Sequence, residues 1–163
     1  AGNKTNAIGT WLKVGDDAQN RQSVGVISFD TSGLPAAAAI ARAELWLKRR
    51  SVTGSPLSDL GDVLVDVNTG AFGNNRLEAG DFQSGATANA AGKLVNFAGT
   101  PGWMRAELDA AGIAALNRIG LTQMRIRFAQ GDDGDGLADF LQLSSGNAAS
   151  ASNRPLLVIT FEP

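Results

Sequence analysis

The sequence predicts an all-β fold, an antiparallel β-sandwich of the jelly-roll type with one short helix, on three observations. Apolar and polar residues alternate with a period of two in several short runs, which is typical of strands with one buried face. Loops rich in Gly, Asn, Asp and Ser separate these runs. Gly is abundant, at 20 of 163 residues, whereas Pro is scarce, at 5, which favours many tight turns over disorder.

The alternation defines the expected strands along the chain. In the third of them, Ala43, Leu45 and Leu47 share one face, and Trp46 and Lys48 lie on the other. The expected strands are, in order, residues 8–14, 23–30, 43–49, 63–67, 103–108, 124–128, 140–143 and 156–161. Short strands of this number are typical of a sandwich or a jelly roll.

The one helix is expected at Asp109–Asn117, where Asp109 is a good N-cap. Ile113, Leu116 and Ile119 recur at intervals of three and would share one face of this helix. We therefore expect the helix to plug one end of the sandwich.

No linker divides the chain and no internal repeat is visible, so residues 1–163 are expected to form a single domain. The pattern is least regular in residues 80–102. We expect a long loop there, with at most one short strand.

Composition excludes several classes of function. Fourteen Lys and Arg residues against sixteen Asp and Glu residues give a net charge of −2, which argues against a nucleic-acid binder. No apolar stretch is long enough to span a membrane, and the N-terminus shows no signal-peptide pattern. The chain contains no His, Cys or Tyr, so a Ser-His-Asp triad, a Cys nucleophile and a His/Cys zinc site are excluded. An enzyme is not expected.

An acidic loop is the candidate metal site. Asp132, Asp133, Asp135 and Asp139 bring four carboxylates into eight positions, interleaved with glycines. Like charges at this density repel unless a cation screens them, and Ca²⁺ takes about six to eight oxygen ligands. We expect these residues to hold a structural Ca²⁺. The alternative is a solvated hairpin loop built on Asp-Gly turn chemistry, since the bidentate Glu of an EF-hand is missing.

Other carboxylates stand outside this loop. Asp16 and Asp17 could add ligands to the cation, but nothing in the sequence brings them to Asp133. Asp30 follows a strand and precedes Thr-Ser-Gly, so we expect it to close an Asx turn with its own carboxylate.

Tryptophans on outward faces are candidates for sugar binding, because a flat aromatic ring stacks on the apolar face of a sugar. Trp11 and Trp46 fall in the polar phase of their strands. The alternative for each is a place in the core, and that is what we expect for Trp103.

Basic residues share these outward positions. Arg125 and Arg127 alternate with apolar residues, so both belong to one sheet face, and Lys48 lies on the same side of its strand as Trp46. Arginine pairs bind carboxylates in a bidentate manner, as an acidic polysaccharide would require. The alternative is a solvated face balanced by nearby glutamates. The candidate ligand-binding residues are Trp46, Lys48, Arg125, Arg127 and Trp11.

Several motifs lie along most of the chain. They are Val-Gly-Asp-Asp at 14–17, Asn-Arg-Gln at 20–22, Ile-Ser-Phe-Asp-Thr-Ser-Gly-Leu-Pro at 27–35, Ile-Ala-Arg-Ala-Glu-Leu-Trp-Leu at 40–47, Asp-Gly-Asp-Gly-Leu-Ala-Asp-Phe at 133–140, Ser-Gly at 145–146 and Asn-Arg-Pro-Leu at 153–156. With these motifs, the sequence resembles the DNRLRE-type domains over about residues 14–161. The resemblance implies a jelly-roll accessory domain appended to secreted bacterial or archaeal proteins, including polysaccharide lyases. Some relatives are carbohydrate-binding modules. Trp46 departs from the family, which more often has a polar residue at that position.

These observations lead to two functional expectations. The first is a non-catalytic carbohydrate-binding module that belongs to a larger secreted polypeptide and binds a polysaccharide, with no nucleic-acid or membrane partner. The second is a calcium-stabilised structural domain of a secreted or cell-surface protein without a soluble glycan ligand. A carboxylate-only glycosidase would need two facing acids, and the sequence offers no such pair.

Overall fold

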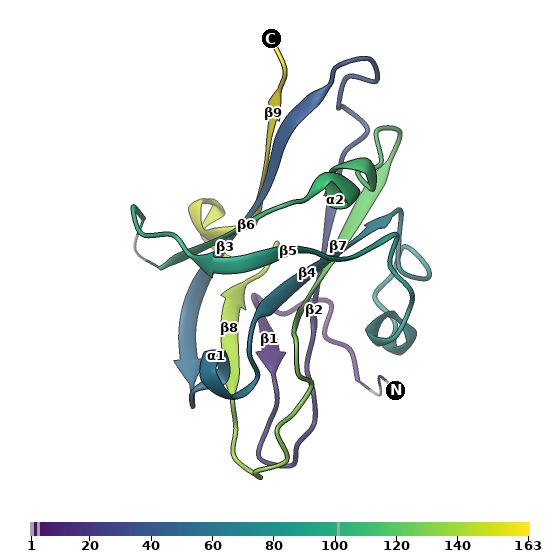
Figure 1. Ribbon diagram of the computed structural model, residues 1–163. Coiled ribbons are helices and arrows are strands. Elements are labelled where there is room, and N and C mark those ends of the chain that lie inside the picture. Colours follow the sequence, from purple (N-terminus) through teal and green to yellow (C-terminus); the bar gives the residue numbers. More distant parts are fainter. Residues whose placement is uncertain (1, 3, 101) are drawn as a thin grey trace.

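The computed structural model describes residues 2, 4–100 and 102–163, which fold mainly into strands (Figure 1). The strands are β1 (Trp11–Gly15), β2 (Gly25–Asp30), β3 (Ile40–Thr53), β4 (Val63–Thr69), β5 (Ala88–Asn96), β6 (Trp103–Glu107), β7 (Leu121–Phe128), β8 (Phe140–Ser144) and β9 (Leu156–Phe161). The helical segments are α1 (Pro56–Asp59), α2 (Ala110–Ala114) and the 3₁₀ turns η1 (Ala79–Phe82) and η2 (Ala151–Asn153). In this part of the chain, no helix has the length and apolar character needed to cross a membrane. The all-β prediction is confirmed.

The nine strands belong to one antiparallel sheet that is nearly closed. Neighbouring strands follow the order β1-β8-β3-β6-β5-β4-β7-β2, and β9 pairs with β3. The long strand β3 pairs with β9 and β6 over its first part and with β8 after a bulge at its second part. Side chains of β2 and β9, among them Phe29 and Ile159, line a surface hollow.

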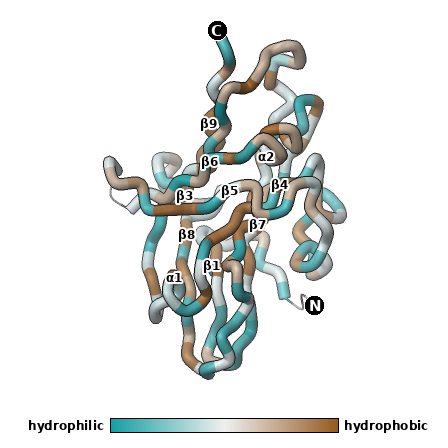
Figure 2. Tube along the Cα trace, viewed as in Figure 1, coloured by the Kyte–Doolittle hydropathy of each residue, from teal (hydrophilic) through white to brown (hydrophobic). Residues whose placement is uncertain are grey.

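The core lies inside the curled sheet. Leu45 and Leu47 of β3, Ile126 of β7 and Leu141 of β8 are all fully buried, because their strands turn this phase of the alternation inward. Hydrophobic residues, brown in Figure 2, recur along the strands, whereas the loops between β1 and β2 and between β7 and β8 are largely hydrophilic. The strand pattern therefore fixes which side chains face outward.

Each of the eight expected strands is found. For residues 80–102, the expectation of at most one short strand was correct in the number of strands within the described residues but wrong in the length of the strand. These residues contain η1 and the nine-residue strand β5. The inward residues of β5 include Ala88 and Ala91, which are too small to give an apolar signal against their neighbours. Ala90 also has a positive φ of 50° and lies where the pairing with β4 shifts register, so the period of two is broken.

The predicted N-cap of the helix is confirmed, because the Asp109 carboxylate accepts a hydrogen bond of 2.8 Å from the Gly112 amide. The helix is shorter than expected and ends at Ala114. Leu116 is buried, but Ile119 lies beyond the helix and is 90% exposed, so its predicted packing was wrong. The prediction of a single helix also missed α1, which begins at a proline.

Candidate functional site

One group of acidic side chains gathers where three segments meet at the start of β8. In the sheet register, Phe140 of β8 pairs with Gly15 of β1 on one side and Thr53 of β3 on the other. This pairing places Asp16, which follows β1, beside Asp139, which precedes β8. It also brings the turn from β3 into α1 to the same place.

Asp139 is the fixed centre of this group. It is 3% exposed, and its carboxylate accepts a hydrogen bond of 2.5 Å from the Ser55 amide. Gly15 and Gly54, both at positive φ, lie so close to Asp139 that a Cβ atom at either position would collide with it. The backbone of β1 and of the β3–α1 turn therefore encloses the residue.

Asp16 is a buried carboxylate with only half of its hydrogen-bonding capacity met. It is 0% exposed, and its Oδ1 accepts a hydrogen bond of 3.1 Å from the Asp139 amide. Its Oδ2 is buried and has no hydrogen-bond donor among the described residues. Burial raises the pKa of Asp16, the negative charges of Asp133 and Asp139 raise it further, and the nearby backbone amides only partly oppose this shift.

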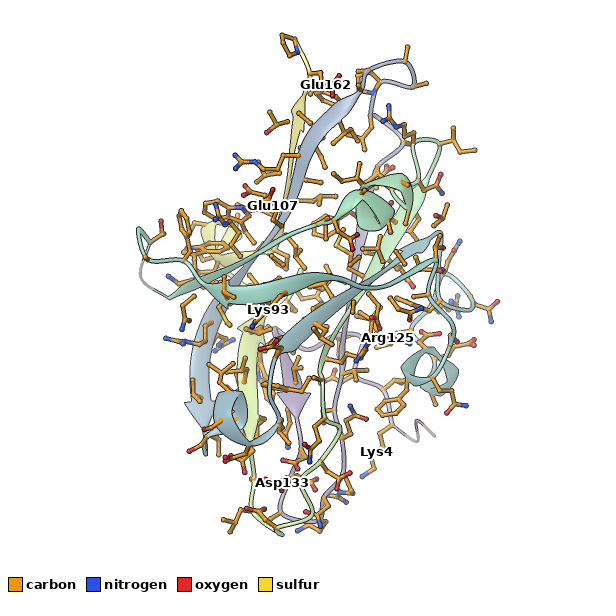
Figure 3. All side chains as sticks on the ribbon, viewed as in Figure 1. Lys4, Lys93, Glu107, Arg125, Asp133 and Glu162 are labelled. Atoms are coloured by element: carbon orange, nitrogen blue, oxygen red, sulfur yellow. The ribbon has the colours of Figure 1, made fainter. Side chains whose placement is uncertain are left out.

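Asp59, at the end of α1, and Asp133, in the β7–β8 loop, complete the group. One carboxylate oxygen from each of Asp59, Asp133 and Asp139 lies within 4.8 Å of the others. Desolvation and the charges of Asp139 and Asp133 raise the pKa of Asp59. Figure 3 shows Asp133 at the end of the molecule opposite Glu162. We refer to Asp16, Asp59, Asp133 and Asp139 as the acidic cluster.

The acidic cluster overlaps the predicted metal site only in part. Asp133 and Asp139 belong to both, whereas the carboxylate of Asp135 accepts a hydrogen bond of 2.6 Å from the Leu137 amide. Asp132 is exposed and lies outside the cluster. The Asp-Gly turn alternative also describes the loop, since Asp133 accepts a hydrogen bond of 3.1 Å from the Asp135 amide. The β7–β8 loop therefore has Asp-Gly turns, and it also contributes Asp133 and Asp139 to the acidic cluster.

Two expectations for the acids outside that loop can be compared with the structure. Asp17 is not in the group of three close acids but pairs with Arg21 at 2.6 Å, and this hydrogen-bonded pair holds the pKa of Asp17 well below its usual range. The Asx turn at Asp30 is confirmed by a hydrogen bond of 3.0 Å from the Ser32 amide. Sequence reasoning missed Asp59, because a lone Asp in a Ser-rich turn carries no sign of its distant partners.

A second candidate region lies on the outward face of β9, β3, β6 and β5. The cross-strand pairing places Leu156, Trp46, Arg105 and Val95 in one row across these four strands. Leu156 is 47% exposed and Val95 is 45% exposed, whereas Trp46 is half-buried. The row is therefore an apolar surface with one cation in it.

Further aromatic rings pack on Trp46. Its ring lies 4.8 Å from that of Phe97 and 6.4 Å from that of Trp103, between centroids. The Arg105 guanidinium lies 4.8 Å from the Phe97 ring, and the Lys48 ammonium 5.7 Å from the Trp103 ring. We refer to this surface as the aromatic face, and its residues are Trp46, Lys48, Val95, Phe97, Trp103, Arg105 and Leu156.

Glu44 anchors the aromatic face from one side. Its carboxylate is buried, lies 3.1 Å from Arg105 and accepts a hydrogen bond of 3.3 Å from the Trp46 indole. These contacts fix the orientation of both side chains. Trp103 was expected in the core, but it is half-buried on this face and stacks edge-on against Trp46.

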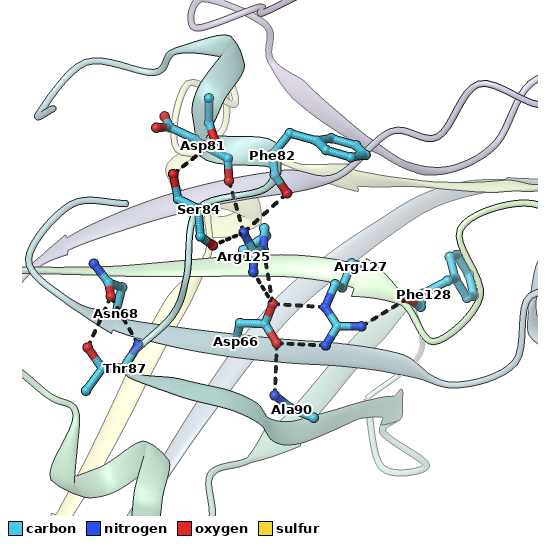
Figure 4. A network of polar contacts seen from close by, with 11 residues as sticks. Asp66, Asn68, Asp81, Phe82, Ser84, Thr87, Ala90, Arg125, Arg127 and Phe128 are labelled. Carbon is cyan, nitrogen blue, oxygen red and sulfur yellow. Dashed lines mark hydrogen bonds and ion pairs between the residues drawn. The ribbon is translucent and has the colours of Figure 1, made fainter. Parts of the chain in front are cut away.

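The expectation that Arg125 lies on an accessible outward face was wrong. It is 6% exposed, because the segment of η1 covers this part of β7 (Figure 4). Its guanidinium binds the Asp66 carboxylate at 2.7 Å and donates to the backbone carbonyls of Asp81, Phe82 and Ser84. Arg125 is therefore part of the interior and is not placed to contact a ligand.

Arg127 belongs to the same buried network. It donates to both carboxylate oxygens of Asp66, at 2.9 and 3.1 Å, and its side chain is 26% exposed. Burial alone would raise the pKa of Asp66, but hydrogen bonds from Arg127, the Ala90 amide and Arg125 outweigh it and leave the pKa below its usual value. In the strand order, β7 lies four steps from β3, so Arg127 and Trp46 do not adjoin.

Trp11 lies on β1 and is 40% exposed, with its ring outward as expected. It pairs across the sheet with Ser144 of β8, outside the row that contains Trp46. From its position before Pro155, Arg154 is expected to tie a loop either to backbone carbonyls or to the Asp-rich turn. It donates to the Ala148 carbonyl at 3.0 Å, which confirms the first alternative.

No family model matches the chain, and no curated protein matches it significantly.

Proposed function

We propose that this chain is a non-catalytic carbohydrate-binding module of a secreted protein, with a jelly-roll fold of the DNRLRE type, and that it binds an extended polysaccharide on the aromatic face. The observation that carries the proposal is the row of Leu156, Trp46, Arg105 and Val95 across four strands. Such a row offers a sugar chain apolar and aromatic surface over several successive rings.

The charges on the aromatic face favour an acidic polysaccharide. Arg105 and Lys48 both lie against aromatic rings, so their charges are held where a sugar would stack. A guanidinium or ammonium group beside a stacked sugar binds a uronate carboxylate by a charge-assisted hydrogen bond. Glu44 offsets part of this charge, which leaves the apolar contacts as the main source of affinity.

The test compares sodium alginate with a neutral soluble β-glucan, by affinity electrophoresis and by Trp fluorescence. We expect alginate to retard the protein, and we expect binding to weaken as salt is raised from about 0.05 to about 0.5 M. Trp46→Ala should abolish retardation, whereas Lys48→Gln should weaken binding of alginate more than binding of the neutral polymer.

Trp11→Ala is the matched control, because it removes an indole from β1 rather than from the aromatic face. Circular dichroism of each variant verifies that the fold is kept. Retained binding by Trp46→Ala, or loss of binding in Trp11→Ala alone, would contradict the proposal.

A second candidate function is a calcium-stabilised structural domain without a glycan ligand. The observation that favours it is the buried, half-satisfied carboxylate of Asp16 beside three other acids. Absence of binding to any polysaccharide, together with a large stabilisation by calcium, would favour this candidate over the first.

A further inference from the structure

We propose that the acidic cluster is a Ca²⁺ site in which Asp16 and Asp59 join Asp133 and Asp139, so that one ion ties three separate segments together. The inference deepens the second candidate function and does not depend on glycan binding. The segments are the start of the β1–β2 loop, α1 and the β7–β8 loop.

The first argument is the charge balance. Oxygens of Asp59, Asp133 and Asp139 lie within 4.8 Å of one another, and Asp16 adjoins this group of three through its hydrogen bond from the Asp139 amide. No ion pair within the described residues joins any of these four carboxylates to Lys or Arg. Like charges this close repel one another. A divalent cation would remove the repulsion directly.

The second argument is independent of the clustering. Asp16 is 0% exposed, and its Oδ2 is buried without a donor, although its other oxygen is held by the Asp139 amide. A buried charged oxygen is unfavourable unless it is hydrogen-bonded or binds a metal. The Asp16 carboxylate adjoins Asp139 through that amide, although it is not one of the three acids whose oxygens lie within 4.8 Å of one another.

The geometry suits calcium. Ligand oxygens on opposite sides of one Ca²⁺ are about 4.8 Å apart, twice a bond length of about 2.4 Å. The oxygens of Asp59, Asp133 and Asp139 lie within 4.8 Å of one another. Mg²⁺ needs a smaller, nearly ideal octahedron and keeps its water, whereas Ca²⁺ accepts irregular carboxylate sets. Asp59 is exposed and Asp133 is partly exposed, so water can supply the remaining ligands.

The loop chemistry explains why these ligands are in place before the ion arrives. The Ser55 amide holds Asp139, the Asp139 amide holds Asp16, and the Asp135 amide holds Asp133. Each of these carboxylates uses one oxygen for its own backbone contact. The ion would bind the remaining oxygens of carboxylates that are already oriented.

The test is calorimetric titration of chelator-treated protein with CaCl₂, followed by hydrogen exchange with and without calcium. We expect saturable heat with one ion per chain. Exchange should slow in all three segments, around residues 15–23, 54–60 and 130–140, and should be unchanged around residues 110–119. MgCl₂ should bind at least ten times more weakly.

Asp59→Asn is the main variant, because this residue is on the surface and its loss should not prevent folding. It should weaken calcium binding at least tenfold and abolish the protection in all three segments. Asp132→Asn, one position outside the cluster, removes the same charge and should change the affinity less than twofold.

Three results would overturn the proposal. One is the absence of both heat and protection at millimolar CaCl₂. Another is protection confined to residues 130–140, which would mean that the β7–β8 loop binds the ion alone. The last is equal weakening by Asp59→Asn and Asp132→Asn, which would indicate unspecific attraction to an acidic surface. None of these results bears on polysaccharide binding, so failure here is distinct from failure on the aromatic face.

Discussion

Asp16 and Asp66 are both 0% exposed, yet the protein treats their charges in opposite ways. Asp66 is surrounded by Arg125, Arg127 and the Ala90 amide, and its pKa is lowered. Asp16 has no ion pair with Lys or Arg among the described residues, and its burial, together with the charges of Asp133 and Asp139, raises its pKa. The charge of Asp66 is thus compensated by two arginines of the chain itself. That of Asp16 has no such partner in the part of the chain that the structure describes, so a bound cation would have to compensate it. Asp66 therefore contributes to stability, whereas for Asp16 we propose a role in calcium binding.

Asp66→Asn should have the largest effect on stability. It leaves Arg125 and Arg127 without a charged partner in the interior, and breaking a buried pair in this way costs about 3–5 kcal/mol. Urea denaturation at pH 7 measures the loss. The control is Asp62→Asn, whose exposed ion pair with Lys93 at 2.6 Å should contribute less than about 1 kcal/mol.

The effect of Asp16→Asn on stability should have opposite signs without and with calcium. In chelator, the amide removes a buried unpaired charge, so the variant should be more stable than the wild type by about 1–3 kcal/mol. In millimolar calcium the order should reverse, because only the wild type gains the free energy of ion binding. Thermal melting under both conditions measures this. If the variant is less stable than the wild type in chelator as well, Asp16 stabilises the fold without calcium, as Asp66 does.

The charge of Asp66 should also make the stability of the protein depend on pH in the acid range. The pKa of Asp66 is lowered in the folded state, so its stabilising effect is complete above the unfolded value of about 3.9 and is lost as pH falls through the folded value. Below about pH 4 the wild type should therefore lose stability more steeply than Asp66→Asn. Urea midpoints between about pH 2 and 6 measure the two slopes, and equal slopes would contradict the assignment.

Asp135→Asn should have the smallest effect on calcium affinity. The carboxylate of Asp135 is engaged with the Leu137 amide and lies outside the group of three close oxygens. We expect less than about a threefold loss of affinity, from the loss of one nearby charge alone. A loss of calcium affinity as large as that of Asp59→Asn would indicate that the β7–β8 loop, and not the acidic cluster, binds the ion.

The sequence was sufficient to predict most of the strands, because each outward or inward position follows from a period of two. It failed at β5, where the inward residues Ala88 and Ala91 are too small to mark a face. Alternation also assigned Arg125 to the outer side of β7 correctly, but it carries no information about the segment of η1 that covers that side.

The acidic cluster was predictable only within one loop. Asp133 and Asp139 are close in sequence, whereas Asp16 and Asp59 reach them through the pairing of β8 with β1 and β3. That register depends on the whole sheet. The aromatic face has the same limitation, because Trp46 was identified from its strand but Phe97 lies in a stretch expected to be an irregular loop.

The most direct test of the account is the position of a calcium ion in crystals grown with CaCl₂, located by its anomalous scattering. The account predicts one peak at about 2.3–2.6 Å from carboxylate oxygens of Asp16, Asp59, Asp133 and Asp139. It also predicts no calcium peak beside Asp66, whose oxygens are held by Arg125 and Arg127. A fully occupied peak bound only by residues 132–135, or no peak at the acidic cluster at saturating calcium, would contradict it.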